Sequence, residues 1–242
     1  MQEILPEAGF KILLFFSTAR LVFILLRKEA MAAMFNHTGI FISFAGLVYI
    51  AFKAGRPPLS GAFEACFYIT FILSLLELIF PKKTHIETSI AGSMVILLVL
   101  VLQSGNQMAL NNDYYMYDSI WVVLFFNMRL LSGAFFLYFM VLNITDFFIH
   151  SSKDEKLSRY SKVFLLAGIF IYLVSEWAGS VWCLNWFGDS WRWSHGFFKA
   201  AILFLLAMLL CHMPKAMEKN RLVKLILGSL PGCFSLAMIS FH

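Results

Sequence analysis

Residues 120–147 read IWVVLFFNMRLLSGAFFLYFMVLNITDF, and this stretch decides the class of fold. Its interior carries one charged side chain, Arg129, in a run long enough to cross the hydrocarbon core of a bilayer. A backbone surrounded by lipid must satisfy its own hydrogen bonds, and within a single segment only a helix does this. The stretch is therefore predicted to be a transmembrane helix.

Comparable apolar runs occupy most of the remaining chain. With a window of about 19 residues, the predicted spans are residues 9–26, 35–54, 60–80, 86–103, 120–147, 161–183, 197–213 and 222–241. Because no internal repeat, linker or low-complexity tract separates them, residues 1–242 are predicted to form a single transmembrane domain. The predicted fold class is all-α, a polytopic integral membrane bundle of about eight transmembrane helices.

The composition points the same way and excludes several classes of protein. Of the 242 residues, 60% are hydrophobic and only 14% are charged, which leaves no room for a sizeable soluble domain. A Rossmann or P-loop enzyme and a secreted disulfide scaffold are therefore excluded. The net charge of +5 comes from basic residues spread along the chain in ones to fours. Membrane lipid is thus an expected partner, and nucleic acid is not.

The basic residues also predict how the helices cross the membrane. Twelve belong to one alternate set of connections: Arg27, Lys28, Lys82, Lys83, Lys153, Lys156, Arg159, Lys162, Lys215, Lys219, Arg221 and Lys224. The other set holds only Lys53, Arg56 and Arg192, with Lys11 near the N-terminus. Basic residues favour cytoplasmic loops, so both termini are predicted to lie outside. The compact loops favour a bacterial inner membrane, with a thylakoid membrane as the alternative.

Tryptophans cluster at the outer end of the predicted sixth span and in the loop that follows. Five of the six fall within residues 177–195, namely Trp177, Trp182, Trp186, Trp191 and Trp193. One interpretation is an interfacial aromatic belt, but a belt is shared among helices, and the other spans contribute only Trp121. The interpretation we favour is an outer platform for a planar hydrophobic ligand such as a porphyrin, because indoles offer rigid area and an N–H donor.

Three blocks of sequence carry a resemblance to a known family. The stretch GSVW at 179–182, with WFGDSWRWS at 186–194, resembles the tryptophan-rich signature, GAxWA followed by WGxxWxWDP, of haem-handling proteins of cytochrome c biogenesis. Residues 55–64, GRPPLSGAFE, resemble the GxxPLSxxYE stretch of its CcsA-type members, and Trp121 with Ser132–Gly133 forms a third, weaker block. The chain thus resembles the CcsA/ResC/CcmC-type family, with a degenerate tryptophan-rich motif.

The sequence departs from the family pattern at the outer haem site. Phe125 lies where the family carries an external haem-ligating histidine, four residues after Trp121. Phe187 replaces the first tryptophan of the motif, Ser194–His195 replace its Asp-Pro, and the chain ends at His242, before the expected second external histidine. These departures leave open whether synthase activity is retained, so the sequence does not decide whether the protein is an enzyme.

Histidines are the candidate ligands of the haem iron, because neutral imidazole is the commonest such ligand. The resemblance places His212 where CcsA-type members carry a histidine at the inner end of the seventh helix. His37 begins the second span on the same side, and the sequence permits the two to face each other as a bis-imidazole pair. His195 is either a replacement for the lost external ligand or a polar residue that caps the seventh helix. His85 and His150 are expected to be solvated.

Several ionisable side chains fall inside the predicted spans, where a charge is costly unless it is paired or functional. They are Arg20, Glu64, Glu77, Arg129, Glu176 and Lys199. Structural pairing is the first interpretation, with an acid of the third helix paired to Arg20 or Arg129, and with Glu64 as an anchor of the outer loop. The second interpretation is that Arg129, Arg192 and Lys199 bind haem propionates through charge-assisted hydrogen bonds.

The resemblance implies a haem-binding or haem-delivery membrane protein of cytochrome c maturation, a CcsA-like subunit of the cytochrome c synthase system. Its cofactor would be haem b, and a partner of the ResB or CcsB type would complete the site. The implied cofactor-binding residues are Trp182, Trp186, Trp191, Trp193, His195, His212, His37 and Arg192. The alternative is a divergent, non-catalytic membrane subunit that anchors a multihaem c-type cytochrome or a respiratory complex. Both readings predict a subunit of a hetero-oligomeric complex.

Overall fold

The computed structural model describes residues 4–59, 61–79, 86–104, 118–148, 155–189, 195–214, 217–218 and 220–240. Its contacts divide the chain into two compact units, Met1–Asn112 and Asp113–His242, which we describe one at a time. Within the described ranges every regular secondary-structure element is a helix, so the predicted all-α class is confirmed. The expectation that all the helices form one transmembrane domain stays a prediction.

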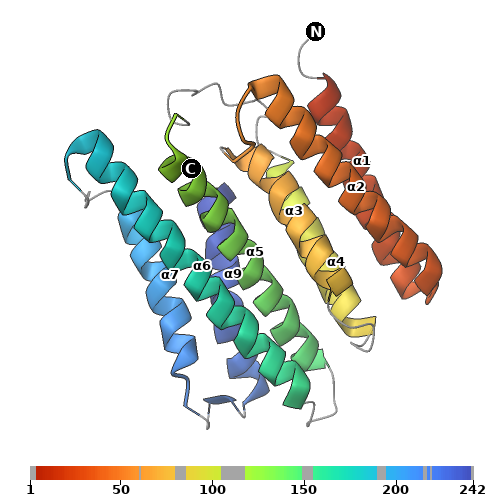
Figure 1. Ribbon diagram of the computed structural model, residues 1–242. Helices are drawn as coiled ribbons and strands as arrows, with labels where there is room; N and C mark the ends of the chain where they lie inside the picture. The colour runs from red at the N-terminus through yellow and green to blue at the C-terminus, as the bar shows by residue number, and fades with distance from the viewer. Residues whose placement is uncertain are drawn as a thin grey trace. The chain divides into compact units, whose positions relative to one another are not determined.

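The first unit is a ring of four helices (Figure 1). Its members are α1 (Ile4–Leu25), α2 (Glu29–Ala54), α3 (Ala62–Ile79) and α4 (Ile86–Gln103). Each helix runs antiparallel to the next and packs against it, and α4 returns to pack against α1. Short connections between antiparallel neighbours are what an up-down-up-down bundle requires.

The second unit repeats this connectivity (Figure 1). It contains α5 (Ile120–Phe148), α6 (Glu155–Phe187), α7 (His195–Cys211) and α9 (Arg221–Ser240), and α9 returns to pack against α5. We call the end at which α5 begins and α6 ends the tryptophan end. The opposite end, at which α5 and α7 end and α6 and α9 begin, is the lysine end.

Three helices extend beyond their predicted spans. α1 begins at Ile4 rather than residue 9, α2 begins at Glu29 rather than residue 35, and α6 covers Glu155–Phe187 rather than 161–183. A hydropathy window misses these ends because they carry charged or polar residues, many of which favour helix nonetheless. The helices α1, α2 and α6 are therefore each longer than the span that hydropathy predicts.

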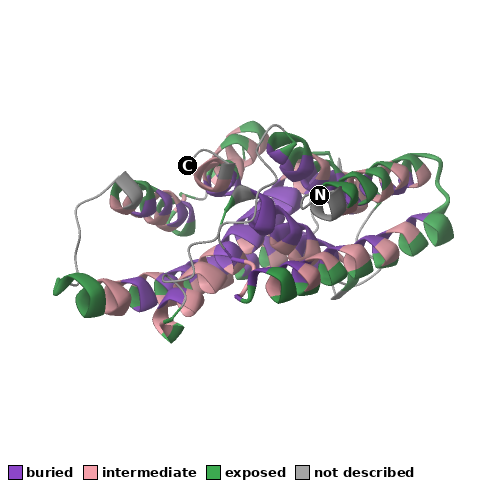
Figure 2. Cartoon of the chain, turned by 90° about the horizontal axis from the view of Figure 1, so that it is seen from above, coloured by how far each residue is buried: buried purple, intermediate pink, exposed green. Residues whose placement is uncertain are grey.

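α2 turns mostly small and polar residues toward its neighbours and several large apolar residues away from them. α2 buries a stripe at helical spacing, and Figure 2 shows buried and exposed positions alternating around individual helices. The stripe consists of Ala32, Asn36, Gly39, Ser43, Leu47, Ile50 and Ala54. On the other side of α2, Phe41 and Phe52 are 70% and 90% exposed. A soluble helix shows the reverse pattern, whereas this one is typical of helices packed in lipid.

The lengths of the helices agree with a multi-pass membrane protein. By length and composition, six of the described helices can each cross a bilayer: α1, α2, α4, α5, α6 and α9. The other two, α3 and α7, have 18 and 17 residues. A helix rises about 1.5 Å per residue, so these two are close in length to α4, which also has 18 residues, and fall only slightly short of a hydrocarbon core of about 30 Å. All the predicted helices are present, and six to eight of them are spans.

Two glycines, spaced four residues apart on α9, allow it to approach α5 closely. A Cβ atom at Gly228 would lie 2.7 Å from Cγ of Asn143. A Cβ atom at Gly232 would lie 3.1 Å from the Phe136 carbonyl oxygen and 3.1 Å from Cβ of Met140. This GxxxG spacing is a common means of bringing two transmembrane backbones together. The interface therefore depends on the absence of side chains at these positions.

Gly232→Ala is expected to lower the free energy of unfolding by about 1 kcal/mol, because overpacking costs about 1–3 kcal/mol while the helix propensity of alanine returns about 1 kcal/mol. Thermal unfolding of the full chain in detergent measures this change. Gly39→Ala is the matched control, since nothing lies within 4 Å of a Cβ atom there, and it is expected to leave stability unchanged or raise it. An equal gain in both variants would contradict the close approach of α9 to α5.

Candidate functional site

The tryptophan end is built on a helix that continues past its predicted span. α6 includes Trp177, Trp182 and Trp186 and ends one residue before Gly188. Gly188 is left-handed, with φ 70°, and its N–H donates to the Leu184 carbonyl at 3.0 Å. A residue without a Cβ adopts this conformation at no steric cost, so Gly188 ends the helix. Three of the five clustered tryptophans therefore lie on a helix, and only the others fall in the connection that follows.

A tightly packed ring fills the position at which the family carries its external histidine. A Cβ atom at Gly179 of α6 would lie 2.6 Å from Cδ2 of Phe125, so this ring rests against bare backbone. The Ser175 hydroxyl donates to the Phe125 carbonyl at 2.9 Å, and the Trp182 and Phe125 ring centroids are 5.9 Å apart. An apolar contact thus joins α5 to α6 here, and α5 supplies no iron ligand at this position.

One turn further along α5, the Arg129 guanidinium lies over the Phe125 ring, 4.5 Å from its centroid. Arg129 donates from Nη2 to the Glu176 carboxylate of α6 and also lies 5.5 Å from the centroid of the Tyr172 ring. The Tyr172 hydroxyl in turn donates to the Ala200 carbonyl of α7 at 2.9 Å. Arg129 therefore has a structural partner, Glu176, within the same unit.

Two hydrogen-bond donors at the tryptophan end are buried and have no acceptor among the described residues. They are Nε of Arg129 and Nε1 of Trp182. A buried donor without an acceptor costs about 1–3 kcal/mol, so we expect another group to complete the site. Because a guanidinium is always charged, it favours an anionic acceptor such as a carboxylate.

Further aromatic rings lie at the tryptophan end. Trp121 of α5 meets Trp177 of α6 edge to face, with ring centroids 5.2 Å apart. Trp177 and Trp186 are about half exposed, and the Trp182 ring also lies 6.4 Å from the Phe126 ring, centroid to centroid. Amphipathic rings at the end of a helix pair suit both an interfacial belt and a ligand platform, so this part of the cluster agrees with both interpretations.

The remaining residues of the predicted platform lie outside the described residues. They are Trp191, Arg192, Trp193 and Ser194, together with the side chain of His195, whose backbone begins α7. Their arrangement as a platform stays a prediction. Lys199, the other predicted propionate ligand, is an exposed residue in the second turn of α7.

The two inner histidine candidates belong to different units. His37 is exposed on α2, and its Nδ1 lies 2.6 Å from the Ala33 carbonyl oxygen. Nδ1–H donates in this contact, which leaves Nε2 as the atom able to bind a metal. His212 is exposed and directly follows α7. Their pairing stays a prediction, and His85, His150 and His242 lie outside the described residues.

Two buried ion pairs stabilise the first unit. Arg56, in the α2–α3 connection, donates from Nη1 and Nη2 to the two carboxylate oxygens of Glu64, at 2.8 and 2.6 Å. These side chains are only 2% and 1% exposed, which confirms the predicted role of Glu64 as a loop anchor. Arg20 of α1 pairs with Glu77 of α3, as predicted for an acid of the third helix. Gly55, left-handed with φ 65°, ends α2 just before the first pair.

Gly179 and the polar side chains of the lysine end were not among the predicted site residues. A glycine within an apolar helix is a signal of close packing, and it could have indicated the contact of Gly179 with α5. From the sequence, the basic residues of the lysine end predict only how the helices are oriented in the membrane. Its ion pairs join segments that are distant in the chain, and no local pattern predicts them.

Comparison with protein-family models finds no match to the chain, and comparison with curated proteins finds none either. The resemblance to haem-handling proteins therefore stays an expectation based on the sequence blocks. Among the described residues, no group of three or more His, Cys, Asp or Glu side chains is placed to hold a metal ion.

The groups at the tryptophan end nonetheless match two parts of a haem group, the propionates at its edge and the flat face of its ring. The unpartnered N–H groups of Arg129 and Trp182 match the chemistry of a propionate. The exposed indoles of Trp177 and Trp186 match that of a flat apolar ring. Phe125, at the position where the resemblance implies an axial ligand, has no atom that can ligate iron.

Proposed function

We propose that the protein is a haem-binding membrane protein of cytochrome c maturation, with its cofactor site at the tryptophan end. The observation that carries this proposal is the pair of buried donors without acceptors, Arg129 Nε and Trp182 Nε1, at the same end of the unit as the exposed indoles of Trp177 and Trp186. A haem propionate would supply the missing acceptor, and the indoles would cover the face of the ring. The blocks at 55–64 and 179–194 support the same class of protein.

The residues of this chain would bind and orient the cofactor. Arg129, held by Glu176, would fix one propionate, and Trp182 would donate its indole N–H. His195 is the proposed outer iron ligand, because it begins α7 directly after the tryptophan-rich segment. His212, directly after α7, is the proposed inner ligand. When bound, haem b supplies the vinyl groups that react with cytochrome thiols, and the chain supplies orientation and exclusion of water.

The membrane orientation and the partners belong to the same proposal. The lysine end would face the cytoplasm of a bacterium and both termini would lie outside, following the distribution of basic residues. A partner of the ResB or CcsB type would provide the iron ligand that Phe125 does not. Assembly into such a hetero-oligomeric complex would also bring the acceptor cytochrome to the platform.

A second function is favoured by the packing of Phe125 against Gly179. A position that once held a ligand, and is now an apolar contact between two helices, is what a non-catalytic descendant would show. Such a subunit would anchor a multihaem cytochrome or a respiratory complex and would not carry out the synthase reaction.

The haem content of the full chain, purified after expression with a haem precursor, tests the proposal. Trp182→Phe keeps an aromatic ring but removes the buried donor. We therefore expect the free energy of haem binding to weaken by about 1–3 kcal/mol, and the haem content to fall accordingly. Trp177→Phe is the matched control, and it should retain haem because phenylalanine keeps an aromatic face and the exposed Trp177 ring supplies no buried donor. The pyridine haemochrome spectrum measures the content in both.

Two histidine variants then distinguish the outer site from the inner one. His195→Ala is expected to lose haem if the altered outer motif acquired a replacement ligand, and His212→Ala is expected to do so if the inner site holds the iron. Haem that persists in both variants when each is isolated in its native complex would point to a ligand from the partner. The absence of haem from the chain and from its native complex would contradict the proposal and favour the non-catalytic subunit.

A further inference from the structure

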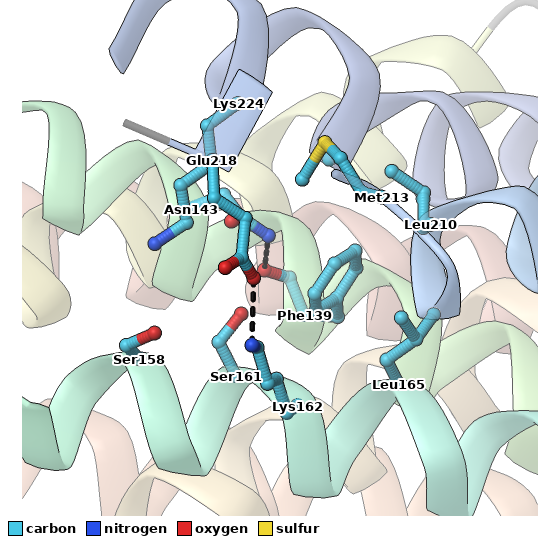
Figure 3. Close-up of a pocket in the computed structure, with 11 residues that line it drawn as sticks. Phe139, Asn143, Ser158, Ser161, Lys162, Leu165, Leu210, Met213, Glu218 and Lys224 are labelled. Carbon is cyan, nitrogen blue, oxygen red and sulfur yellow. Dashed lines mark hydrogen bonds and ion pairs between the residues drawn. The ribbon is translucent and has the colours of Figure 1, made fainter. Parts of the chain in front are cut away.

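The lysine end of the second unit contains a pocket that the proposed function does not use. Figure 3 shows residues from α5, α6, α7, α9 and the α7–α9 connection around it. The polar lining consists of Asn143, Ser158, Ser161, Lys162, Glu218 and Lys224. Leu165 and Leu210 contribute to an apolar wall beside them. Charged and apolar groups therefore meet within one small site.

Carboxylates hold two ammonium groups at this pocket. Lys162 and Glu218 form an ion pair, drawn as a dashed line in Figure 3, with Nζ 2.6 Å from Oε1. Lys224 donates to Asp146 Oδ2 at 2.8 Å. An ammonium carries three N–H donors, so each lysine keeps donors beyond its ion pair. Ser161, a buried residue of α6, adds a hydroxyl to the lining. These groups are the donors that a phosphate needs.

Glu218 occupies the place at which an anion would be bound. The cavity has a volume of about 20 Å³, which is room for one water molecule, so a larger group enters only by displacing a side chain. The side chains of Lys162 and Glu218 are 60% and 27% exposed. An ion pair this exposed contributes little stability. A competing anion can therefore replace the Glu218 carboxylate at Lys162.

The pocket lies where the apolar parts of four helices stop. α5 ends at Phe148 and α7 at Cys211, while α9 begins at Arg221. Segments 149–162 and 212–224 carry four basic residues each, eight in all, against three acidic residues. Basic pockets between transmembrane helices at a membrane face bind anionic lipid headgroups.

We propose that this pocket binds the phosphate group of an anionic phospholipid, which displaces Glu218 from Lys162. The phosphate accepts hydrogen bonds from Lys162, Lys224 and Ser161, and the lipid chains lie along exposed apolar side chains such as Leu166, which is one turn after Lys162 on α6 and 58% exposed. This exposed apolar surface favours a lipid over a soluble phosphate, because inorganic phosphate has no apolar part to place there. The site is at the opposite end of the unit from the tryptophans, so it does not depend on haem.

Native mass spectrometry of the full chain in detergent, with phosphatidylglycerol and phosphatidylcholine as probes, tests the proposal. We expect phosphatidylglycerol to bind preferentially. Lys162→Gln and Lys224→Gln should each weaken its binding about five-fold, the effect of one basic contact near the membrane surface. Glu218→Gln should strengthen its binding by a similar factor, because that variant removes the competing carboxylate.

Arg159→Gln is the matched control, since it removes the same charge from an exposed residue of α6 that does not line the pocket. Equal losses of lipid binding in Arg159→Gln and Lys162→Gln would show that the lipid is held by general electrostatic attraction and not by the pocket, and would overturn the proposal. Unchanged binding in Glu218→Gln would overturn the displacement of Glu218. Inorganic phosphate that raises the thermal stability of the lipid-free protein, but not of Lys162→Gln, would assign the site to a soluble anion and overturn the lipid source.

Discussion

Glu64→Leu is expected to lower the free energy of unfolding by about 3–5 kcal/mol, because it leaves the Arg56 guanidinium buried without its carboxylate. Arginine stays charged in proteins, so it cannot escape this cost by losing a proton. The pair is bidentate, with N–O distances of 2.8 and 2.6 Å, and it fastens the α2–α3 connection to the first turns of α3. Unfolding of the full chain in detergent with increasing dodecyl sulfate measures the change.

The double variant Arg56→Met/Glu64→Leu separates the cost of an unpaired charge from the loss of packing. Replacement of both members of a buried pair by apolar residues of similar volume is often neutral. We therefore expect the double variant to recover most of the stability that Glu64→Leu loses. A double variant as unstable as the single one would show that the pair contributes through shape and not through charge.

Phe125→His is expected to give the haem-loaded protein a low-spin spectrum and to tighten haem binding on the order of ten-fold, the effect of about 1.4 kcal/mol. This expectation rests on the proposed site, since the resemblance places an axial ligand at this position. Gly179 leaves space for a ring against α6, and imidazole is smaller than the benzyl group it replaces. Visible absorption spectra of the oxidised and reduced protein record the change in spin state.

Phe126→His provides the comparison for this variant. Phe126 follows on the same helix and also lies near Trp182, 6.4 Å between ring centroids, but it occupies a different face of α5. It should leave the spin state unchanged. The same spectral change in both variants would mean that any imidazole near the tryptophans binds the iron. No change in Phe125→His would contradict the proposed position of the haem.

The helices could be predicted from the sequence because hydropathy is a local property. Each apolar run, such as 120–147, became a helix of similar extent, observed as Ile120–Phe148. The start of α2 at Glu29 and the polar start of α6 were missed because a hydropathy window detects the most apolar part of a helix and not its full length. Gly188 marks the end of α6 through its left-handed conformation, which hydropathy does not register.

The pairing of charges was only partly predictable. An arginine inside a span needs a partner, and this rule led to an acid of the third helix paired with Arg20 or Arg129, which the structure resolves as Arg20 with Glu77. It did not lead to Arg129 with Glu176, because the rule says nothing of which helices are neighbours. The unpartnered donors of Arg129 and Trp182 are set by side-chain orientation, and they could be found only in three dimensions.

The tight reversal between α1 and α2 has a consequence for how the chain enters the membrane. Only Leu26, Arg27 and Lys28 separate the two helices, and the ring of Phe23 in α1 stacks on that of Phe35 in α2, 5.1 Å between centroids. Two adjacent positive charges at the tip are costly to move through lipid. We therefore expect α1 and α2 to leave the translocation channel together, as one preassembled hairpin whose tip stays on the side of synthesis.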